Sequence, residues 1–239
     1  MNIILKTVLF WIVKLQKWHD LTEELVSTTF ILFFLTFFNT AVLIFIVNFD
    51  MDIGLPEGFP ILKGWYQEFT VEWYQSIGSQ LLLTMIIGIF SPHIANMINW
   101  TIEVLLRLWD QKCRCNSKRT RQIFQVDYEW VHTHSNYLIE YWYSQLITLM
   151  HVTFMYGSGM PLLYIIALVS IFCIYWMDKI SLLRWYKTPP RYSSKLMARA
   201  WMWMTPMLVI HLCLGFWMFS NSTIFETDKE VLFGHTIGS

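Results

Sequence analysis

Polar side chains recur at helical spacing inside an otherwise apolar stretch between residues 76 and 99. In a helix, residues three or four positions apart share a face. Hydroxyl and amide oxygens gathered on one face can line a pore, where they replace part of an ion's hydration shell. The same groups also join packed helices by hydrogen bonds, so helix packing is an open alternative. The candidate pore-lining residues in this stretch are Gln80, Thr84, Ser91 and Asn99.

Gly88 and Pro92 lie four positions apart within the same stretch. A proline removes the backbone hydrogen bond to the carbonyl four residues earlier, which here is that of Gly88. The pair therefore predicts a kink, and a gating hinge is the functional interpretation. A static bend is the alternative, because membrane helices tolerate proline.

A second polar set lies between residues 139 and 156 and consists of Ser144, Gln145, Thr148 and His151. Its helical spacing predicts a face that meets the first set. Thr148 and His151 are therefore added to the pore-lining candidates. A lone histidine such as His151 can also be an interior residue held by one hydrogen bond rather than a proton relay.

Metal-binding and catalytic patterns are nearly absent from the sequence. Cys113 and Cys115, taken with His132 and His134, are the only metal-like set, although zinc ligands usually stand two to four residues apart. Plain thiols or palmitoylation sites are the alternative for cysteines beside a membrane. No acid pair, nucleophile motif or phosphate-binding glycine loop occurs, so we predict neither an enzyme nor a cofactor.

The composition identifies the medium in which the chain folds. Of its 239 residues, 55% are hydrophobic and 14% are charged, whereas soluble domains carry about 25% charged residues. The formal net charge is zero, and a nucleic-acid-binding protein would have a basic excess. The sequence predicts an integral membrane protein whose first partner is the lipid bilayer.

About five segments approach the roughly 20 apolar residues that a membrane helix needs. Asp20 and Glu23 form the capping pattern of a helix start before the first of them. The predicted fold is an all-α, polytopic transmembrane helix bundle over residues 20–219. Residues 1–19 are expected to form an amphipathic interfacial helix, and residues 220–239 an extracytoplasmic tail. The predicted spans are Phe30–Val47, Ile77–Ile98, Ile139–Tyr156, Met160–Met177 and Ala200–Phe219.

The distribution of basic residues predicts the orientation. Six of the 17 Lys and Arg residues lie between Arg107 and Arg121, and six more between Lys179 and Arg199. The segment between the first two spans is acidic and has only Lys63. The positive-inside rule therefore predicts a cytoplasmic N-terminus and an extracytoplasmic C-terminus. The plasma membrane is the expected location.

Six short motifs follow one another along the chain: Leu25–Asn48, Glu72–Tyr74, Ser91–His93, Tyr156–Pro161, Trp176–Lys179 and Leu183–Tyr186. The most specific is a hairpin with a proline corner, an apolar run and a basic, aromatic exit. In this order the motifs resemble those of protist members of the osmosensitive, stress-gated calcium-permeable cation channel family, whose superfamily includes the anoctamins and the transmembrane channel-like proteins.

The resemblance implies that the five spans correspond to the fifth to ninth membrane helices of the family, so that the chain matches its C-terminal half. Spans one to three would then lie beside the pore, and the second span would be the helix associated with gating. Cations would be the cargo. Other membrane helices, the missing half of the channel or further copies of the chain would be the partners.

Two alternatives keep the same fold. A lipid scramblase of the same superfamily needs a groove that opens to the bilayer. A non-transporting scaffold subunit needs polar residues that are satisfied inside a packed bundle without a continuous void. The polar set on the second span is compatible with all three functions.

Overall fold

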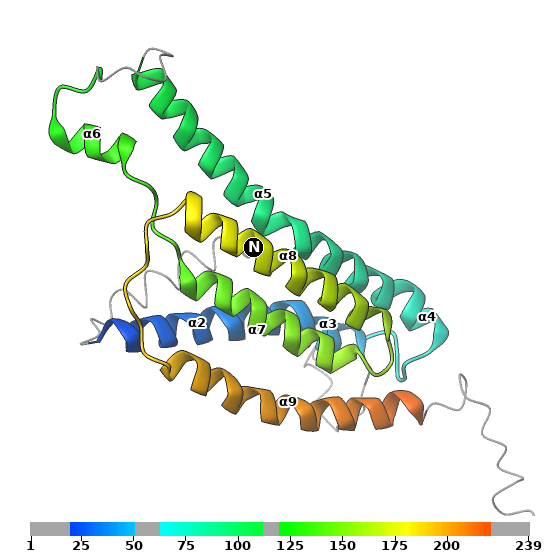
Figure 1. Cartoon of the computed structure of the whole chain (residues 1–239). Coiled ribbons are helices and arrows are strands. Elements are labelled where there is room, and N and C mark those ends of the chain that lie inside the picture. Colours follow the sequence, from blue (N-terminus) through cyan, green and yellow to red (C-terminus); the bar gives the residue numbers. More distant parts are fainter. Residues whose placement is uncertain (1–19, 51–62, 112–119, 221–239) are drawn as a thin grey trace, which may run out of the picture.

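The computed structural model describes residues 20–50, 63–111 and 120–220, and these residues form helices joined by short connections (Figure 1). No strand occurs within the described residues, where β-pairing is limited to isolated bridges. The predicted all-α bundle is confirmed. The expected amphipathic helix over residues 1–19 and the tail beyond Ser220 lie outside the described residues.

The first membrane helix consists of α2 (Leu21–Phe37), a π-helical turn η1 (Phe38–Val42) and α3 (Leu43–Asn48). The predicted cap is present, because the Asp20 carboxylate accepts a hydrogen bond from the Thr22 amide at 3.1 Å. A side chain from another helix stabilises the π-helical turn, because the buried Tyr156 hydroxyl donates a hydrogen bond to the Ala41 carbonyl at 2.9 Å. Thr40 in this turn lines a cavity inside the bundle.

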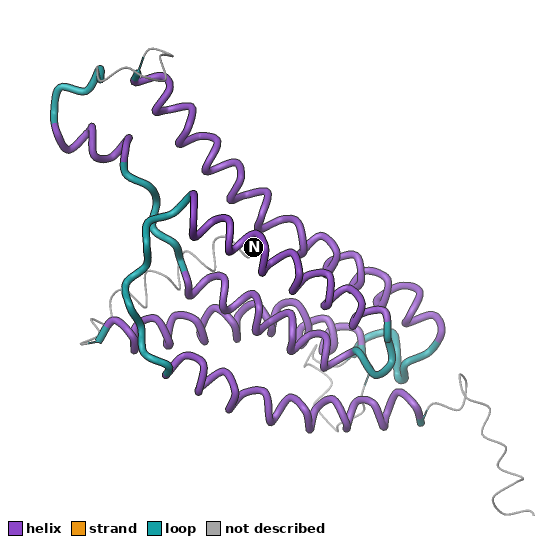
Figure 2. The backbone as a smooth tube through the Cα atoms, in the orientation of Figure 1, coloured by secondary structure: helices purple, strands orange, loops and turns teal. Residues whose placement is uncertain are grey.

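The second membrane helix is the longest and consists of α4 (Val71–Trp73), η2 (Tyr74–Gly78) and α5 (Ser79–Asp110). Its 40 residues would extend about 60 Å at 1.5 Å per residue, twice the roughly 30 Å of a bilayer core. The predicted second span ended at Ile98, whereas the helix continues for three more turns. Figure 2 shows the end of α5 projecting beyond the other helices, together with α6 (Gln125–His132).

Three further helices complete the bundle: α7 (Ile139–Tyr156), α8 (Leu162–Arg184) and α9 (Lys195–Phe219). The bounds of α7 are those predicted, and α9 contains the fifth predicted span. The fourth predicted span began at Met160, whereas α8 begins at Leu162 after Pro161. The five long helices run alternately in opposite directions (Figure 1). The connections after α5 and after α8, which contain Arg121, Lys187 and Arg191, lie at the same end as the start of α2.

The five predicted spans differ in how apolar their helices are. Within the described ranges, four helices are long and apolar enough to cross a membrane, and α7 is not among them. The physical reason is its position, because α7 packs against α2, α8 and α9 and more than half of its residues are buried. A helix enclosed by protein can carry Ser144, Gln145 and His151, since these side chains avoid the hydrocarbon. The four apolar helices around it make the chain an integral membrane protein.

Candidate functional site

The two faces of α5 differ in their surroundings. Its buried side chains form a stripe at helical spacing: Leu81, Met85, Ile89, His93 and Asn96. The predicted pore-lining residues Gln80, Thr84, Ser91 and Asn99 are all exposed. This part of α5 packs mainly against α8. Within the part of the chain that the structure describes, these four side chains therefore do not join α5 to a neighbouring helix.

A cavity of about 170 Å³ lies between η1, α2, α5, α7 and α8, and we call it the middle cavity. Gly88 is part of its wall, and a Cβ atom built on Gly88 would meet none of the described residues within 4 Å. Pro92 also lines it. The polar residues around it come from the first membrane helix, α5, α7 and α8: Thr36, Thr40, Thr84, Gln145, Thr148 and Ser170.

Four of these hydroxyl groups have a common orientation. The hydroxyls of Thr36, Thr84, Thr148 and Ser170 each donate to the carbonyl four residues earlier in their own helix, at 2.7 to 2.8 Å. A hydroxyl has one proton and two acceptor lone pairs. Because the proton is used within the helix, each hydroxyl offers only acceptor lone pairs to the cavity. Such a wall favours water and cations over anions.

A second cavity of about 570 Å³, which we call the end cavity, lies between the C-terminal half of α5, α6, and the adjoining ends of α7 and α8. Asn99 and Asn96 are part of its wall, as are several Trp and Tyr side chains. Pro92 and Trp142 line both cavities. The two cavities therefore meet at these two residues and follow α5 toward the basic end of the bundle.

A pair of stacked rings stands where the two cavities meet. The rings of His93 and Trp142 lie 5.7 Å apart between centroids and are nearly parallel, at 8°. Both side chains are buried, at 7% and 8% exposed. Among the described residues, neither ring nitrogen of His93 has a hydrogen-bond partner. Among the described residues, no hydrogen bond therefore fixes the His93 ring, which is stacked on Trp142 by a flat aromatic contact.

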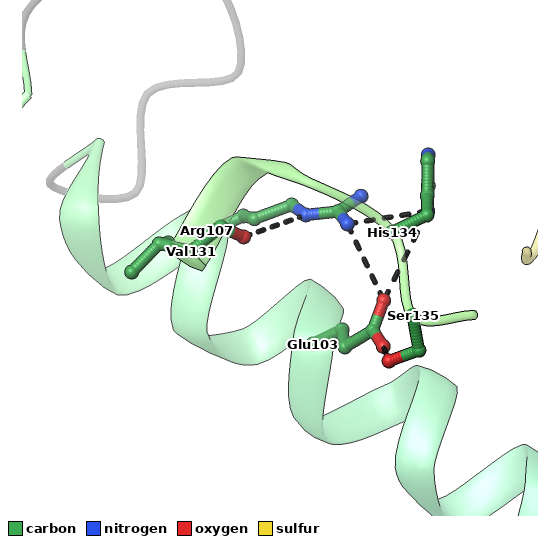
Figure 3. A network of polar contacts seen from close by, with 5 residues as sticks. All are labelled: Glu103, Arg107, Val131, His134 and Ser135. Atoms are coloured by element: carbon green, nitrogen blue, oxygen red, sulfur yellow. Dashed lines mark hydrogen bonds and ion pairs between the residues drawn. The ribbon is translucent and has the colours of Figure 1, made fainter. Parts of the chain in front are cut away.

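The wall of the end cavity is held in place by a polar network shown in Figure 3. Arg107 on α5 donates to the carbonyl of Val131 at 3.1 Å, contacts Glu103 at 3.3 Å and reaches Nδ1 of His134 at 3.2 Å. Ser135 donates to the other oxygen of the Glu103 carboxylate. These contacts attach the segment after α6 to α5.

The hydroxyl of Tyr186 donates to Oδ1 of Asn96 at 2.8 Å and so connects the end of α8 to α5. Burial raises the pKa of Tyr186, and the nearby charges of Glu103 and Asp178 raise it further. The phenol therefore stays neutral and remains a hydrogen-bond donor at physiological pH.

The predicted site residues fall into three groups. Thr84, Thr148, Gly88 and Pro92 line the middle cavity, and Asn99 lines the end cavity with Pro92. Among the described residues, Gln80 and Ser91 line neither cavity. His151 lies elsewhere, against Phe33 and Phe37 at centroid distances of 4.5 and 5.7 Å, in an apolar hollow between α2 and α9.

The sequence analysis missed Thr36, Thr40, Ser170 and Asn96. Thr36 and Thr40 stand four residues apart in the first predicted span, which is the same pattern that identified Thr84. Applying the pattern to every span would have found this pair. Ser170 is a single serine in an apolar helix, and no spacing in the sequence marks it.

The metal-like set is not assembled among the described residues, which contain no group of three or more potential metal ligands. His132 contacts the buried Asp110 carboxylate at 3.0 Å, and His134 belongs to the network of Arg107. Cys113 and Cys115 lie outside the described residues.

Comparison of the chain with protein-family models, curated proteins and solved structures found no match. The resemblance to osmosensitive cation channels therefore stays a prediction.

Proposed function

We propose that this integral membrane protein forms part of a channel-type cation path that runs along α5 through the middle and end cavities. The observation that carries the proposal is the orientation of the four hydroxyl groups in the middle cavity, which offer lone pairs and no protons. Oxygen lone pairs of this kind can replace water around a permeating cation. The two cavities also oppose the scaffold alternative, which needs a packed interface around Thr148.

The junction at His93 and Trp142 is the proposed gate. Pro92 lines both cavities beside this ring pair, so a bend of α5 at Pro92 would change the separation of the rings. Tension in the bilayer is the proposed stimulus, in line with the resemblance to stress-gated channels. By the positive-inside rule, the end cavity would face the cytoplasm. The missing half of a channel, other membrane helices or a second copy would complete the path.

One observation favours lipid transport as a second candidate. Gln80 and Ser91 are exposed on α5, within a helix apolar enough to cross a membrane, and line neither cavity among the described residues. A lipid headgroup moving along the outside of α5 would meet these two side chains. The two candidates therefore use different faces of the same helix.

Cation flux into proteoliposomes containing the full chain tests the proposal. We expect flux above that of protein-free vesicles on osmotic swelling. We also expect flux without swelling in the Trp142→Ala variant, because removing the indole joins the two cavities. The enlarged junction should raise flux at least about tenfold, since pore width sets the barrier. A fluorescent cation indicator inside the vesicles measures the flux on swelling and the flux of the variant without swelling.

A labelled-lipid scrambling assay on the same vesicles separates the alternatives. Lipid scrambling without cation flux, in both the unmodified chain and the Trp142→Ala variant, would contradict the channel proposal. It would favour lipid transport along the outer face of α5. Flux and scrambling both equal to those of protein-free vesicles would contradict transport altogether. Trp176→Ala on the exposed face of α8, which lines neither cavity among the described residues, is the matched control and should behave like the unmodified protein.

A further inference from the structure

The end cavity is unusually aromatic for a polar cavity at the end of a membrane bundle. Six aromatic side chains from α5, α6, α7 and the segment after α8 belong to its wall: Trp100, Trp130, Tyr141, Trp142, Trp185 and Tyr186. Trp100 and Trp185 are stacked, with their ring centroids 5.3 Å apart and an interplanar angle of 22°. The face of an aromatic ring is negative and attracts cations that shed their water readily.

The charge in the cavity is nearly balanced, so a small metal cation can pass through it but is not bound tightly there. Glu103 is the only charged residue in the described wall, and its carboxylate already contacts Arg107 and Ser135. A metal ion needs several free oxygen ligands to replace its strongly bound water. A quaternary ammonium group has no N–H and holds water weakly, so aromatic faces alone can bind it.

Asn96 adds a second requirement for the ligand. Its side chain is 8% exposed and its Oδ1 accepts the hydrogen bond of Tyr186. Among the described residues its Nδ2 has no partner, and a buried donor without an acceptor is costly. Because Asn96 belongs to the wall of the end cavity, a ligand there could supply the missing acceptor when the amide, whose Nδ2 is buried, turns toward it. That ligand would carry an oxygen close to its ammonium group.

We propose that the end cavity binds a quaternary ammonium group that carries a neighbouring oxygen, as in choline and in the phosphocholine headgroup. The volume of about 570 Å³ lies within the range of small-molecule sites in proteins. The ammonium group would lie against the aromatic rings, and the hydroxyl or phosphate oxygen would accept from Nδ2 of Asn96. This site goes beyond the proposed cation path, and ligand binding does not require that the path conduct.

Binding of choline to the purified full chain in a maltoside detergent tests the proposal without any flux measurement. Radiolabelled choline is displaced with choline chloride, tetramethylammonium chloride or sodium chloride at equal ionic strength. We expect saturable binding, displacement by both ammonium salts and none by sodium chloride. A second arm offers phosphatidylcholine mixed equally with phosphatidylethanolamine and measures the lipid retained by mass spectrometry. Enrichment of phosphatidylcholine would identify a lipid headgroup as the source of the ligand, and binding of choline alone would identify a soluble one.

Variants separate recognition by the rings from a general structural role. Trp185→Leu keeps an apolar side chain and removes the π face, so we expect about tenfold weaker binding, in line with a desolvated cation–π contact. Trp185→Phe should restore most of the affinity. Asn96→Leu should remove the preference for choline over tetramethylammonium and keep binding of tetramethylammonium. Trp176→Leu, outside the described wall, should change nothing.

Three results would overturn the proposal. One is the absence of binding of choline, tetramethylammonium and phosphatidylcholine to the unmodified chain. Another is equal weakening by Trp185→Leu and Trp176→Leu in proteins that elute identically on size exclusion. The third is displacement by sodium chloride as effective as that by tetramethylammonium, which would mean simple ionic screening. These three outcomes are binding measurements, so they do not depend on whether the protein conducts cations in the proteoliposome assay.

Discussion

Replacing Gly88 by leucine is expected to reduce cation flux at least about tenfold, because pore width controls passage, and to leave the bundle folded. A Cβ at Gly88 would meet none of the described residues within 4 Å, so a larger side chain enters open space. Gly88 is part of the wall of the middle cavity of about 170 Å³, so we expect an isobutyl group there to occupy much of the cavity. The flux assay on proteoliposomes, with the Trp142→Ala background as the conducting form, measures the loss.

Two variants control for changes in the helix itself. Gly88→Ala should stabilise α5 by about 0.5–1 kcal/mol, since glycine weakens a helix interior, while leaving most of the flux. Ile87→Phe enlarges a side chain at an exposed position outside the described cavity walls and should conduct normally. Undiminished flux through the Gly88→Leu protein, at equal amounts in the vesicles, would show that ions do not cross the middle cavity.

Replacing Gly64 by alanine is expected to cost about 2–4 kcal/mol of folding free energy, the range of severe steric substitutions. A Cβ atom there would stand 2.1 Å from the carbonyl carbon of Asn48 and 2.2 Å from its oxygen. Both are backbone atoms, so no side chain can move aside. The same carbonyl accepts hydrogen bonds from the amides of Trp65 and Tyr66, both at 3.1 Å. The new methyl group would therefore break the closure of this segment on the end of α3.

Thermal unfolding in detergent, followed by fluorescence-detected size exclusion, measures this loss as an earlier transition. Gly88→Ala is the matched control, because it adds the same methyl group where nothing lies within 4 Å of it among the described residues. Gly64→Ala should unfold at a distinctly lower temperature, and Gly88→Ala at the same or a higher one. Equal transitions for both variants would contradict the close approach of Gly64 to Asn48.

The helices could be predicted from the sequence where local chemistry decides them. Asp20 caps α2 as expected, and the bounds of α7 match the prediction. The length of α5 was underestimated, because Val104, Leu105 and Leu106 extend the apolar pattern beyond the length that a bilayer requires. Hydropathy averaged over one span cannot show that a helix projects past the membrane.

The neighbours of each polar residue could not be predicted, because they depend on how the helices rotate and pack. Thr148 and His151 are three residues apart on α7, yet one lines the middle cavity and the other faces α2 and α9. Gln80 and Thr84 share a face of α5, and only Thr84 reaches the cavity wall. Spacing identifies a face of a helix, but the partner of that face is a property of the whole bundle.

The central claim is that the cavities along α5 contain water, and substituted cysteines test it most directly. In a chain whose four native cysteines are replaced by serine, Thr84→Cys, Asn99→Cys and Ile87→Cys are exposed to a membrane-impermeant methanethiosulfonate reagent in proteoliposomes. We expect the cysteines at positions 84 and 99 to react at least about tenfold faster than the one at position 87, since thiolates form in water and not in hydrocarbon. Equal, slow reaction at all three positions would contradict a hydrated path along α5.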